Sequence, residues 1–419
     1  MKVKRLKMQS FRGIGDLTLD FNENEPTVFI GINGVGKSSI IDCLAILLSR
    51  FTSSIQHSTP SGRLFTEEDI TNGEKETHNE INISLDSEEI IWSLTKVKKG
   101  HNKNTSSNLL AISKVAESIK KNLHTSDLFN IPIAVYYSTN RSVLDIPLRI
   151  RTQHSFEQID IYENALQGIG SEFKLFFEWF RKQEDLENEL RLEDNNAAYR
   201  DKQLEAVRQA ISSLIPSFSH LRIRRSPLRM TVQKQGKELI VNQLSDGEKC
   251  LLAMVGDLAR RLAIANPGLH DPLQGTGVVL IDEIELHLHP KWQRGIIPDL
   301  TRTFPNCQFI VTTHSPQVIS DVKPEGIYIL EKTDKGVIAK RPESSFGRDS
   351  NRILEDLMDV PERPLQIKES LLEMFRMIDA GNLEDARKVR QQLANDIGSD
   401  EPEFVRADVL IRRKEILNR

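Results

Sequence analysis

One segment of the chain carries residues of the types and spacing that bind nucleotide phosphates. Residues 31–38 read GINGVGKS and fit the P-loop pattern GxxxxGK[ST] between an apolar strand and an apolar helix. Glycines there let backbone N–H groups surround phosphate oxygens, and the helix N-terminus adds a favourable dipole. Lys37 is expected to neutralise the β- and γ-phosphates, and the Ser38 hydroxyl to ligate Mg²⁺. The sequence thus predicts a site for ATP and Mg²⁺ with the binding residues Asn33, Gly34, Val35, Gly36, Lys37, Ser38 and Ser39.

A second segment, residues 277–290, places two carboxylates directly after a run of apolar residues. The run predicts a buried strand, and its carboxyl end is where open α/β sheets keep their ligands. Asp282 is expected to hold Mg²⁺ through its water shell, and Glu283 to orient and deprotonate an attacking water as a general base. Carboxylate pairs also occur in ordinary solvated turns, so this motif gains its weight from the P-loop beside it.

Two further segments supply candidate residues that are less specific when taken alone. The apolar strand FIVTT (309–313) ends at His314, and a lone histidine is more often structural than catalytic. LSDGEK (244–249) precedes an apolar helix, where Ser245 and Glu248 have the spacing of a capping box. Because a capped helix N-terminus is also an anion site, this segment can both begin a helix and contact a phosphate.

The order of these segments resembles that of the ABC-type ATPase heads found in RecF-like, SMC-like and overcoming-lysogenization-defect-like proteins of the AAA family. The resemblance covers residues 1 to about 330. It implies a homodimer or higher homo-oligomer of heads, in which the signature of one protomer closes on the nucleotide held by the P-loop of another. Signature residues here are Ser245, Gly247 and Glu248, with Asp246 in place of the usual glycine.

The same resemblance implies roles for residues outside the signature. His314 matches the switch histidine that contacts the γ-phosphate, Glu285–Pro290 match the D-loop, and Arg12 matches a position near the base or phosphates. The family's Q-loop glutamine has no clear counterpart after the strand IPIAVYY, where Asn140 or Gln153 are the alternatives.

Three stretches resemble the ATPase subunit of Septu-type bacterial anti-phage systems, which are also found attached to certain retrons. They read YYSTNRSVLDIPLRI, FFEWFRKQEDLENE and SSFGRDSNRILEDLM. This resemblance implies an ATPase that restrains or licenses a separately encoded HNH-type nuclease. The chain after His314 shows no E…DxD cluster of a two-metal nuclease, which agrees with a cutting domain on a partner. The alternatives are a RecF/SMC-like DNA repair or recombination ATPase without a dedicated nuclease, and a nucleotide-gated scaffold.

A basic strip at residues 220–237 is a candidate nucleic-acid contact, because it contains no acidic residue. Such a strip could bind phosphates of DNA, or of retron RNA/DNA, with an affinity that falls steeply with salt. Charge runs are, however, usually solvated faces. The candidate contacts are Arg222, Arg224, Arg225 and Arg229, with Arg141, Arg149 and Arg151 as a second set.

The elements that must position these residues predict an α/β fold. We expect an ABC-type P-loop ATPase head at residues 1–345, with a helical insertion at about 100–220, and a C-terminal helical region at 346–419. Imperfect alternation at residues 2–11 predicts an edge strand, and residues 81–85 and 91–98 predict a hairpin. From residue 364 the pattern predicts two or three amphipathic helices, with a break at Gly381-Asn382 and Ser399 as the last N-cap. Their apolar positions can serve either packing or partner docking.

Composition indicates a globular protein without a membrane partner. With 56 Lys+Arg against 60 Asp+Glu the formal net charge is −4, which argues against coating nucleic acid through net charge alone. No stretch approaches about 18 uncharged apolar residues, so no membrane span is expected. The charged N-terminus does not fit a signal peptide, and three cysteines without metal or redox spacing suit a reducing compartment. We therefore expect a cytoplasmic location.

Overall fold

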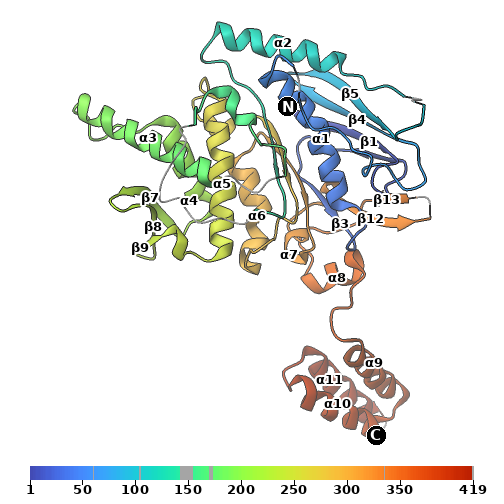
Figure 1. Cartoon of the computed structure of the whole chain (residues 1–419). Helices are drawn as coiled ribbons and strands as arrows, with labels where there is room; N and C mark the ends of the chain where they lie inside the picture. Colours follow the sequence, from blue (N-terminus) through green and yellow to red (C-terminus); the bar gives the residue numbers. More distant parts are fainter. Residues whose placement is uncertain (60, 103–104, 142–153, 169–172, 335, 418–419) are drawn as a thin grey trace. The chain divides into compact units, whose positions relative to one another are not determined.

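The chain folds into two compact units, Met1–Arg348 and Asp349–Arg419, which we call the head and the tail unit. The computed structural model describes residues 1–59, 61–102, 105–141, 154–168, 173–334 and 336–417. The head contains three sheets and the helices packed on them (Figure 1). Arg348 lies close to the predicted end of the ATPase head.

The central sheet of the head has six strands in the order β13-β12-β3-β11-β10-β6. Neighbouring strands run parallel except β13, which pairs antiparallel with β12 at one edge. Every residue of β6, β10 and β11 is buried, as expected for parallel strands covered on both faces. The bounds are β3 Thr27–Ile30, β6 Ile133–Tyr137, β10 Gly277–Ile281, β11 Cys307–Thr312, β12 Ile327–Thr333 and β13 Gly336–Lys340.

A four-stranded antiparallel sheet, in the order β2-β1-β4-β5, packs beside the helix α1 (Figure 1). The prediction of an edge strand at residues 2–11 is wrong, because β1 lies between β2 and β4. A register shift between Val3 and Arg5 accounts for the imperfect alternation that suggested an edge. The predicted hairpin is confirmed with longer strands. The bounds are β1 Lys2–Gln9, β2 Leu17–Asp20, β4 Glu76–Leu85, β5 Glu88–Val97 and α1 Lys37–Gln56.

Within the described part of the chain, α1 is the one helix that is long and apolar enough to cross a membrane. Of its most apolar stretch, 78% is buried within the head. The helix also begins at Lys37, directly after the P-loop. Its apolar composition therefore matches its place between the two larger sheets, where a core helix is expected.

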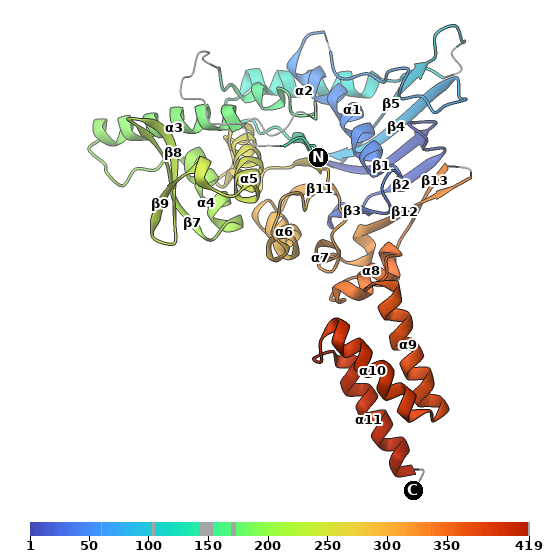
Figure 2. The same cartoon turned by 60° about the horizontal axis from the view of Figure 1, so that its bottom comes forward.

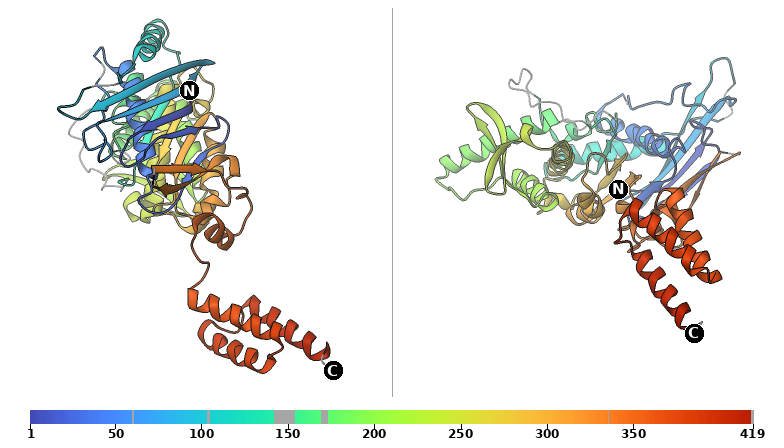
Figure 3. Two further views of the ribbon diagram at one scale, coloured as in Figure 1. Left: turned by 90° about the vertical axis from the view of Figure 1, so that its right-hand side faces the viewer. Right: turned by 90° about the horizontal axis from the view of Figure 1, so that it is seen from below.

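Helices and a small sheet form a lobe at the end of the head away from β4 and β5 (Figure 3). The helix α5 packs against α3 and α4 of this lobe and against β6 of the central sheet, so it joins the two regions. The predicted insertion at 100–220 also contains β6 and the helix α2, which packs on α1 and β5. The bounds are α2 Leu110–Thr125, α3 Phe173–Glu193, α4 Lys202–Leu214, β7 Phe218–Arg225, β8 Leu228–Lys234, β9 Lys237–Ile240, α5 Asp246–Ala265, α6 Pro290–Thr303 and α7 Pro316–Ile319.

The tail unit is helical and has its own apolar core (Figure 2). Gly381 ends α9 in the left-handed conformation, with φ +86°, where glycine is favoured. Ser399 is wrong as an N-cap, because α11 begins at Pro402, and proline suits a first helical turn. The predicted α/β class with a helical tail is confirmed. The bounds are α8 Ser350–Met358, α9 Leu365–Ala380, α10 Leu383–Ile397 and α11 Pro402–Leu417.

Candidate functional site

A pocket of about 280 Å³ lies where β3, β10 and β11 end at the central sheet. Every residue predicted to bind ATP or Mg²⁺, or to take part in hydrolysis within one head, lines it. The sequence analysis missed the contribution of β12 and β13, which add an exposed lysine and a buried valine. The lining residues are Arg12, Gly13, Asn33, Gly34, Val35, Gly36, Lys37, Ser38, Ser39, Asp282, Glu283, His314, Lys332 and Val337.

The P-loop needs glycine at position 31 for steric reasons. Gly31 has φ +145°, and a Cβ there would lie 2.6 Å from the Leu330 carbonyl oxygen. The Lys37 ammonium donates to the carbonyl oxygens of Gly31 at 2.8 Å and Ile32 at 3.1 Å. Burial lowers the pKa of Lys37, while the nearby Asp282 carboxylate opposes that shift. The lysine is therefore held inside the loop by neutral carbonyl groups, with its charge available to a phosphate.

A threonine of β11 bonds to both residues that follow β10. The Thr312 hydroxyl donates to Asp282 Oδ1 at 2.5 Å and accepts from the Glu283 backbone N–H at 2.7 Å. The Asp282 N–H donates to the Tyr137 carbonyl oxygen of β6 at 2.9 Å. Glu283 has φ +48°, a left-handed conformation that is unfavourable for a residue with a side chain. The Asp282 carboxylate and the backbone of both residues are thus held by bonds to the strands on either side.

Arg141, which follows β6, is buried behind these carboxylates. Its side chain is 2% exposed and donates to the carbonyl oxygens of Asp282, at 2.6 Å, and of Glu283. The hypothesis that Arg141 contacts nucleic acid is therefore wrong, because a phosphate cannot reach it. The other members of that set, Arg149 and Arg151, lie outside the described residues.

One alternative for the Q-loop glutamine does not line the pocket, and the other falls outside the described residues. Asn140 is exposed on the turn after β6 and does not line the pocket. Gln153 lies outside the described residues.

Glu285 positions the segment that carries His314. Its carboxylate accepts from the His314 backbone N–H at 2.6 Å and from the Thr313 hydroxyl at 2.7 Å. Sequence reasoning placed Glu285 in the D-loop but gave it no contact. The available signal was a third acidic residue at a spacing of two after Glu283.

Arg12 lines the pocket, but its guanidinium already has two carboxylate partners. It bonds to Asp69 Oδ1 at 2.6 Å and to Asp42 Oδ2 of α1 at 2.6 Å. Its side chain is 33% exposed, and the residue has φ +46°. Arg12 therefore braces α1 beside the P-loop while it borders the pocket.

The signature segment lies at the N-terminus of α5. Ser245 caps the helix, since its Oγ accepts from the Glu248 N–H at 3.4 Å, and Glu248 accepts in return from the Ser245 N–H at 3.1 Å. Burial raises the pKa of Glu248, but the 2.5 Å ion pair with Lys234 and the bonds from Ser245 hold this pKa below its ordinary value. A Cβ on Gly247 would lie 2.3 Å from the His287 carbonyl oxygen, so the signature packs directly on the D-loop.

No signature residue lines the P-loop pocket among the described residues. Ser245 and Asp246 are instead exposed at the start of α5. The predicted signature thus forms a helix cap, and it lies outside the pocket of its own head.

The donor set at the pocket fits Mg²⁺. The Ser38 hydroxyl and the Asp282 carboxylate are oxygen ligands, and Mg²⁺ binds through one or two carboxylates together with nucleotide phosphates. In the described part of the chain, no group of three His, Cys, Asp or Glu side chains could hold a metal alone. A cation here would therefore be held jointly by the protein and the nucleotide.

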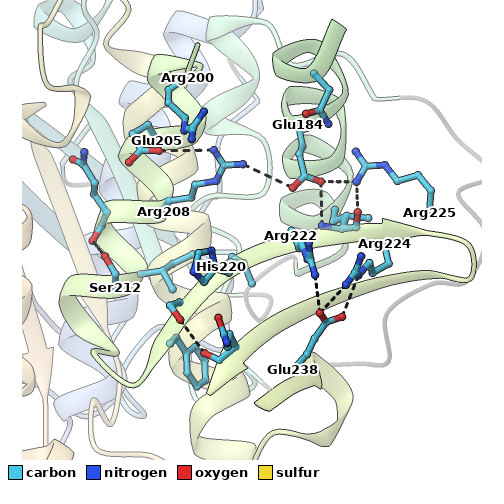
Figure 4. Close-up of a pocket in the computed structure, with 18 of the residues that line it drawn as sticks. Glu184, Arg200, Glu205, Arg208, Ser212, His220, Arg222, Arg224, Arg225 and Glu238 are labelled. Atoms are coloured by element: carbon cyan, nitrogen blue, oxygen red, sulfur yellow. Dashed lines mark hydrogen bonds and ion pairs between the residues drawn. The ribbon is translucent and has the colours of Figure 1, made fainter. Parts of the chain in front are cut away.

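A larger pocket of about 1000 Å³, which we call the lobe groove, lies between α3, α4 and β7 (Figure 4). Arg222 and Arg224 both bond to Glu238, at 2.7 and 2.8 Å, while Arg225 bonds to Glu184 at 2.5 Å. Hydrogen bonds from Arg224 and Arg222 lower the pKa of Glu238 to about 2.

The basic strip is therefore partly neutralised by carboxylates that lie next to it in space. Arg225 also bonds to Asp185 of α3, so each of the three candidate arginines in the groove has an acidic partner. Arg229 is half-buried and does not line the groove. Acidic residues absent from the strip in sequence are thus supplied by α3 and β9.

Comparison with known proteins identifies the family. Residues 5–218 match a family model described as "AAA domain", and residues 125–320 match one described as "AAA domain, putative AbiEii toxin, Type IV TA system". The retron Ec83 probable ATPase of Escherichia coli is 30% identical over 99% of this chain and 87% of its own length. The retron Vc95 probable ATPase of Vibrio cholerae is 30% identical over 93% and 86%. Septu protein PtuA of Bacillus thuringiensis is 24% identical over 91% and 90%.

Among solved structures, the SMC head domain from Thermotoga maritima overlaps with a TM-score of 0.43 at 17% identity, covering 82% of this chain and 100% of that one. The fold assignment rests on the sheet order and the pocket rather than on this partial overlap. The resemblance to Septu- and retron-type ATPase subunits is confirmed by the sequence relatives. The chain belongs to the family of AAA-domain ATPases that includes the retron Ec83 and Vc95 probable ATPases.

Proposed function

We propose that this chain is the ATP-hydrolysing subunit of a cytoplasmic anti-phage defence complex, in which two heads close on ATP and Mg²⁺ to control a separately encoded HNH-type nuclease. One observation carries the proposal. The P-loop pocket gathers the residues expected to bind and cleave ATP, while the signature at Ser245 is exposed outside it. A second head is the partner that would bring a signature to this pocket.

The pocket supports a direct hydrolysis in which Glu283 acts as the general base. The oxygen of the attacking water bonds to the γ-phosphorus while Glu283 takes a proton from that water. The bond between the γ-phosphorus and the ADP oxygen breaks in the same step. Lys37 and the P-loop N–H groups stabilise the negative charge on the phosphates, and His314 borders the γ-phosphate. Bound Mg²⁺, held by Ser38 and Asp282, would neutralise further phosphate charge.

The contact between Gly247 and the His287 carbonyl supports a dimer that senses ATP. Because the signature and the D-loop are packed together in one head, they would present a single surface to the opposite nucleotide. The positive end of α5 would favour the γ-phosphate of ATP over ADP, which lacks it. ATP would then stabilise the closed dimer, and hydrolysis would release it.

The nuclease partner is proposed from the relatives and from the tail unit. Of the three relatives described above, two are named for retrons and one for Septu. In the tail unit, α9 and α11 carry exposed apolar side chains that a partner could cover, namely Leu365, Leu372, Val405, Val409 and Ile416.

A second candidate function is contact with nucleic acid in the lobe groove. Six arginines but three glutamates line it, an excess of positive charge that favours a phosphate backbone. This contact fits either a defence complex that senses DNA or retron RNA/DNA, or the alternative of a RecF/SMC-like repair ATPase without a nuclease.

Phage challenge of cells that express the chain with its native neighbouring genes separates these functions. We expect Glu283→Gln to change protection, whereas Glu331→Gln, a carboxylate of β12 paired with Lys340, leaves it unchanged. Intact protection by Glu283→Gln together with sensitivity to DNA damage would instead favour the repair ATPase. Unchanged phage protection together with normal resistance to DNA damage would contradict both the defence function and the repair function.

A further inference from the structure

Arg141 joins the segment after β6 to the segment after β10 without lining the P-loop pocket. Its guanidinium donates to the carbonyl oxygens of Ser138 at 3.1 Å, of Asp282 at 2.6 Å and of Glu283. It is absent from the described residues that line the P-loop pocket. Its contacts are therefore with the backbone that carries the two carboxylates, and not with the ligand.

Burying this guanidinium is costly, and the cost indicates what it is needed for. Burial lowers the pKa of Arg141, and among the described residues no carboxylate lies within the 4.0 Å of an ion pair. A buried cation without an ion-pair partner is tolerated where its hydrogen bonds fix a required geometry. Arginine offers five N–H donors in a fixed planar geometry, so it can reach the three carbonyl oxygens at once.

The geometry that it fixes is the peptide of Glu283. That residue has φ +48°, which costs an L-residue about 1–2 kcal/mol. Thr312 holds its N–H side at 2.7 Å, and Arg141 holds its carbonyl side. With both ends of the residue held, the direction in which its side chain leaves the backbone is fixed by the protein.

The segment that ends at Arg141 is also bonded to the signature helix α5. The Cys250 thiol donates to the Arg141 carbonyl oxygen at 3.1 Å. The Tyr137 hydroxyl donates to Asp257 Oδ2 at 3.0 Å. Since Tyr137 also accepts the Asp282 N–H, residues 137–141 contact α5 on one side and the carboxylate segment on the other.

We propose that Arg141 is a positioning residue for ATP hydrolysis, which holds the Glu283 peptide so that its carboxylate faces the attacking water and links that peptide to the signature helix. This inference rests on the proposed role of Glu283 as general base. Displacing a catalytic group by about 1 Å can cost up to about 100-fold in rate.

Steady-state hydrolysis and nucleotide binding of the full chain test this role. Arg141→Gln is expected to lower kcat about 10- to 100-fold and to leave the Kd for ATP within about 2-fold. Arg141→Lys keeps the charge and should recover part of the rate. Because Arg141 acts through Glu283, adding Arg141→Gln to Glu283→Gln should lower kcat no further than Glu283→Gln alone.

A matched control is Arg191→Lys, which alters a half-buried arginine of α3 paired with the buried Glu187 at 2.5 Å. It should lower thermal stability without the loss of kcat. Cys250→Ala removes only the thiol donor and should lower kcat by about 2- to 5-fold. An unchanged kcat in Arg141→Gln, or a further loss in the double variant, would overturn the inference. A normal kcat in Glu283→Gln would instead mean that the general-base assignment itself has failed.

Discussion

The P-loop pocket and the lobe groove both gather positive charge, but they leave different amounts of it available. In the pocket, Lys37 bonds to neutral carbonyl oxygens, so a phosphate can pair with its charge. In the groove, Arg222 and Arg224 share Glu238, and Arg225 is bonded to Glu184. An anion in the groove would have to displace these carboxylates. The comparison teaches that the partners of a cation, and not its presence, indicate a ligand site.

The largest effect is expected at the carboxylate of the P-loop pocket. Glu283→Gln keeps the shape of the side chain but removes the general base, so kcat for ATP hydrolysis should fall at least about 100-fold. The Kd for ATP should stay close to that of the unaltered chain, because the proposed role of Glu283 is to take a proton from the attacking water and not to bind ATP. Phosphate release and nucleotide binding measure the two effects separately, and a parallel loss of binding would contradict the assigned role.

The second-largest effect is expected when the charge of Lys37 is removed, because the pocket should then bind ATP more weakly. Lys37→Ala loses a charge-assisted contact to phosphate, and the Kd for ATP should rise about 10- to 100-fold. In the groove, Arg224→Ala provides the comparison, and it should leave the Kd for ATP unchanged. Equal ATP affinities of Lys37→Ala and the unaltered chain would show that the pocket does not use its lysine in this way.

The contact between the signature and the D-loop predicts a stability effect of intermediate size. Gly247→Ala places a Cβ against the His287 carbonyl oxygen and should destabilise the head by about 1–3 kcal/mol. Gly295→Ala is the matched helical control, since its Cβ would meet the flexible Asp299 carboxylate at 3.2 Å. Thermal unfolding of both variants measures this difference, and equal stabilities would contradict the close packing.

The smallest effect is expected when a carboxylate is removed from the lobe groove. Glu238→Gln frees Arg222 and Arg224, so the slope of log affinity for DNA against log salt should steepen by about 1 to 2. Glu331→Gln serves as the surface control. An unchanged slope in Glu238→Gln would mean that the groove does not contact phosphates.

Lowering the pH within the usual experimental range should not have the same effect as Glu238→Gln. The pKa of Glu238 is about 2 in the folded chain, below its ordinary value of 4.5. Its stabilising ion pairs are thus present above the ordinary pKa and are lost only as the pH falls toward 2. We therefore expect Glu238→Gln to change the slope of log affinity for DNA against log salt by the same amount at pH 6 and pH 8, as filter binding of both chains at both values can check.

The sequence predicted the pocket better than the contacts that hold it together. The P-loop and the Asp282-Glu283 pair are local patterns, because each follows a buried strand and the strand order brings them together. Arg141 gave no such signal, since its partners are backbone carbonyl groups far along the chain. The basic strip predicts more unpaired positive charge than the structure leaves, for a related reason. Glu184 lies on another element, and Glu238 falls just beyond the end of the strip.

We propose that the exposed signature of one head completes the P-loop pocket of another. Light scattering on Glu283→Gln with ATP and Mg²⁺ tests it most directly, with Glu283→Gln/Ser245→Arg as the comparison. We predict that ATP doubles the mass of the single variant relative to the nucleotide-free chain, whereas the double variant binds ATP without the mass change. An ATP-bound Glu283→Gln head whose mass does not respond to ATP, or a dimer that tolerates Ser245→Arg, would contradict this account.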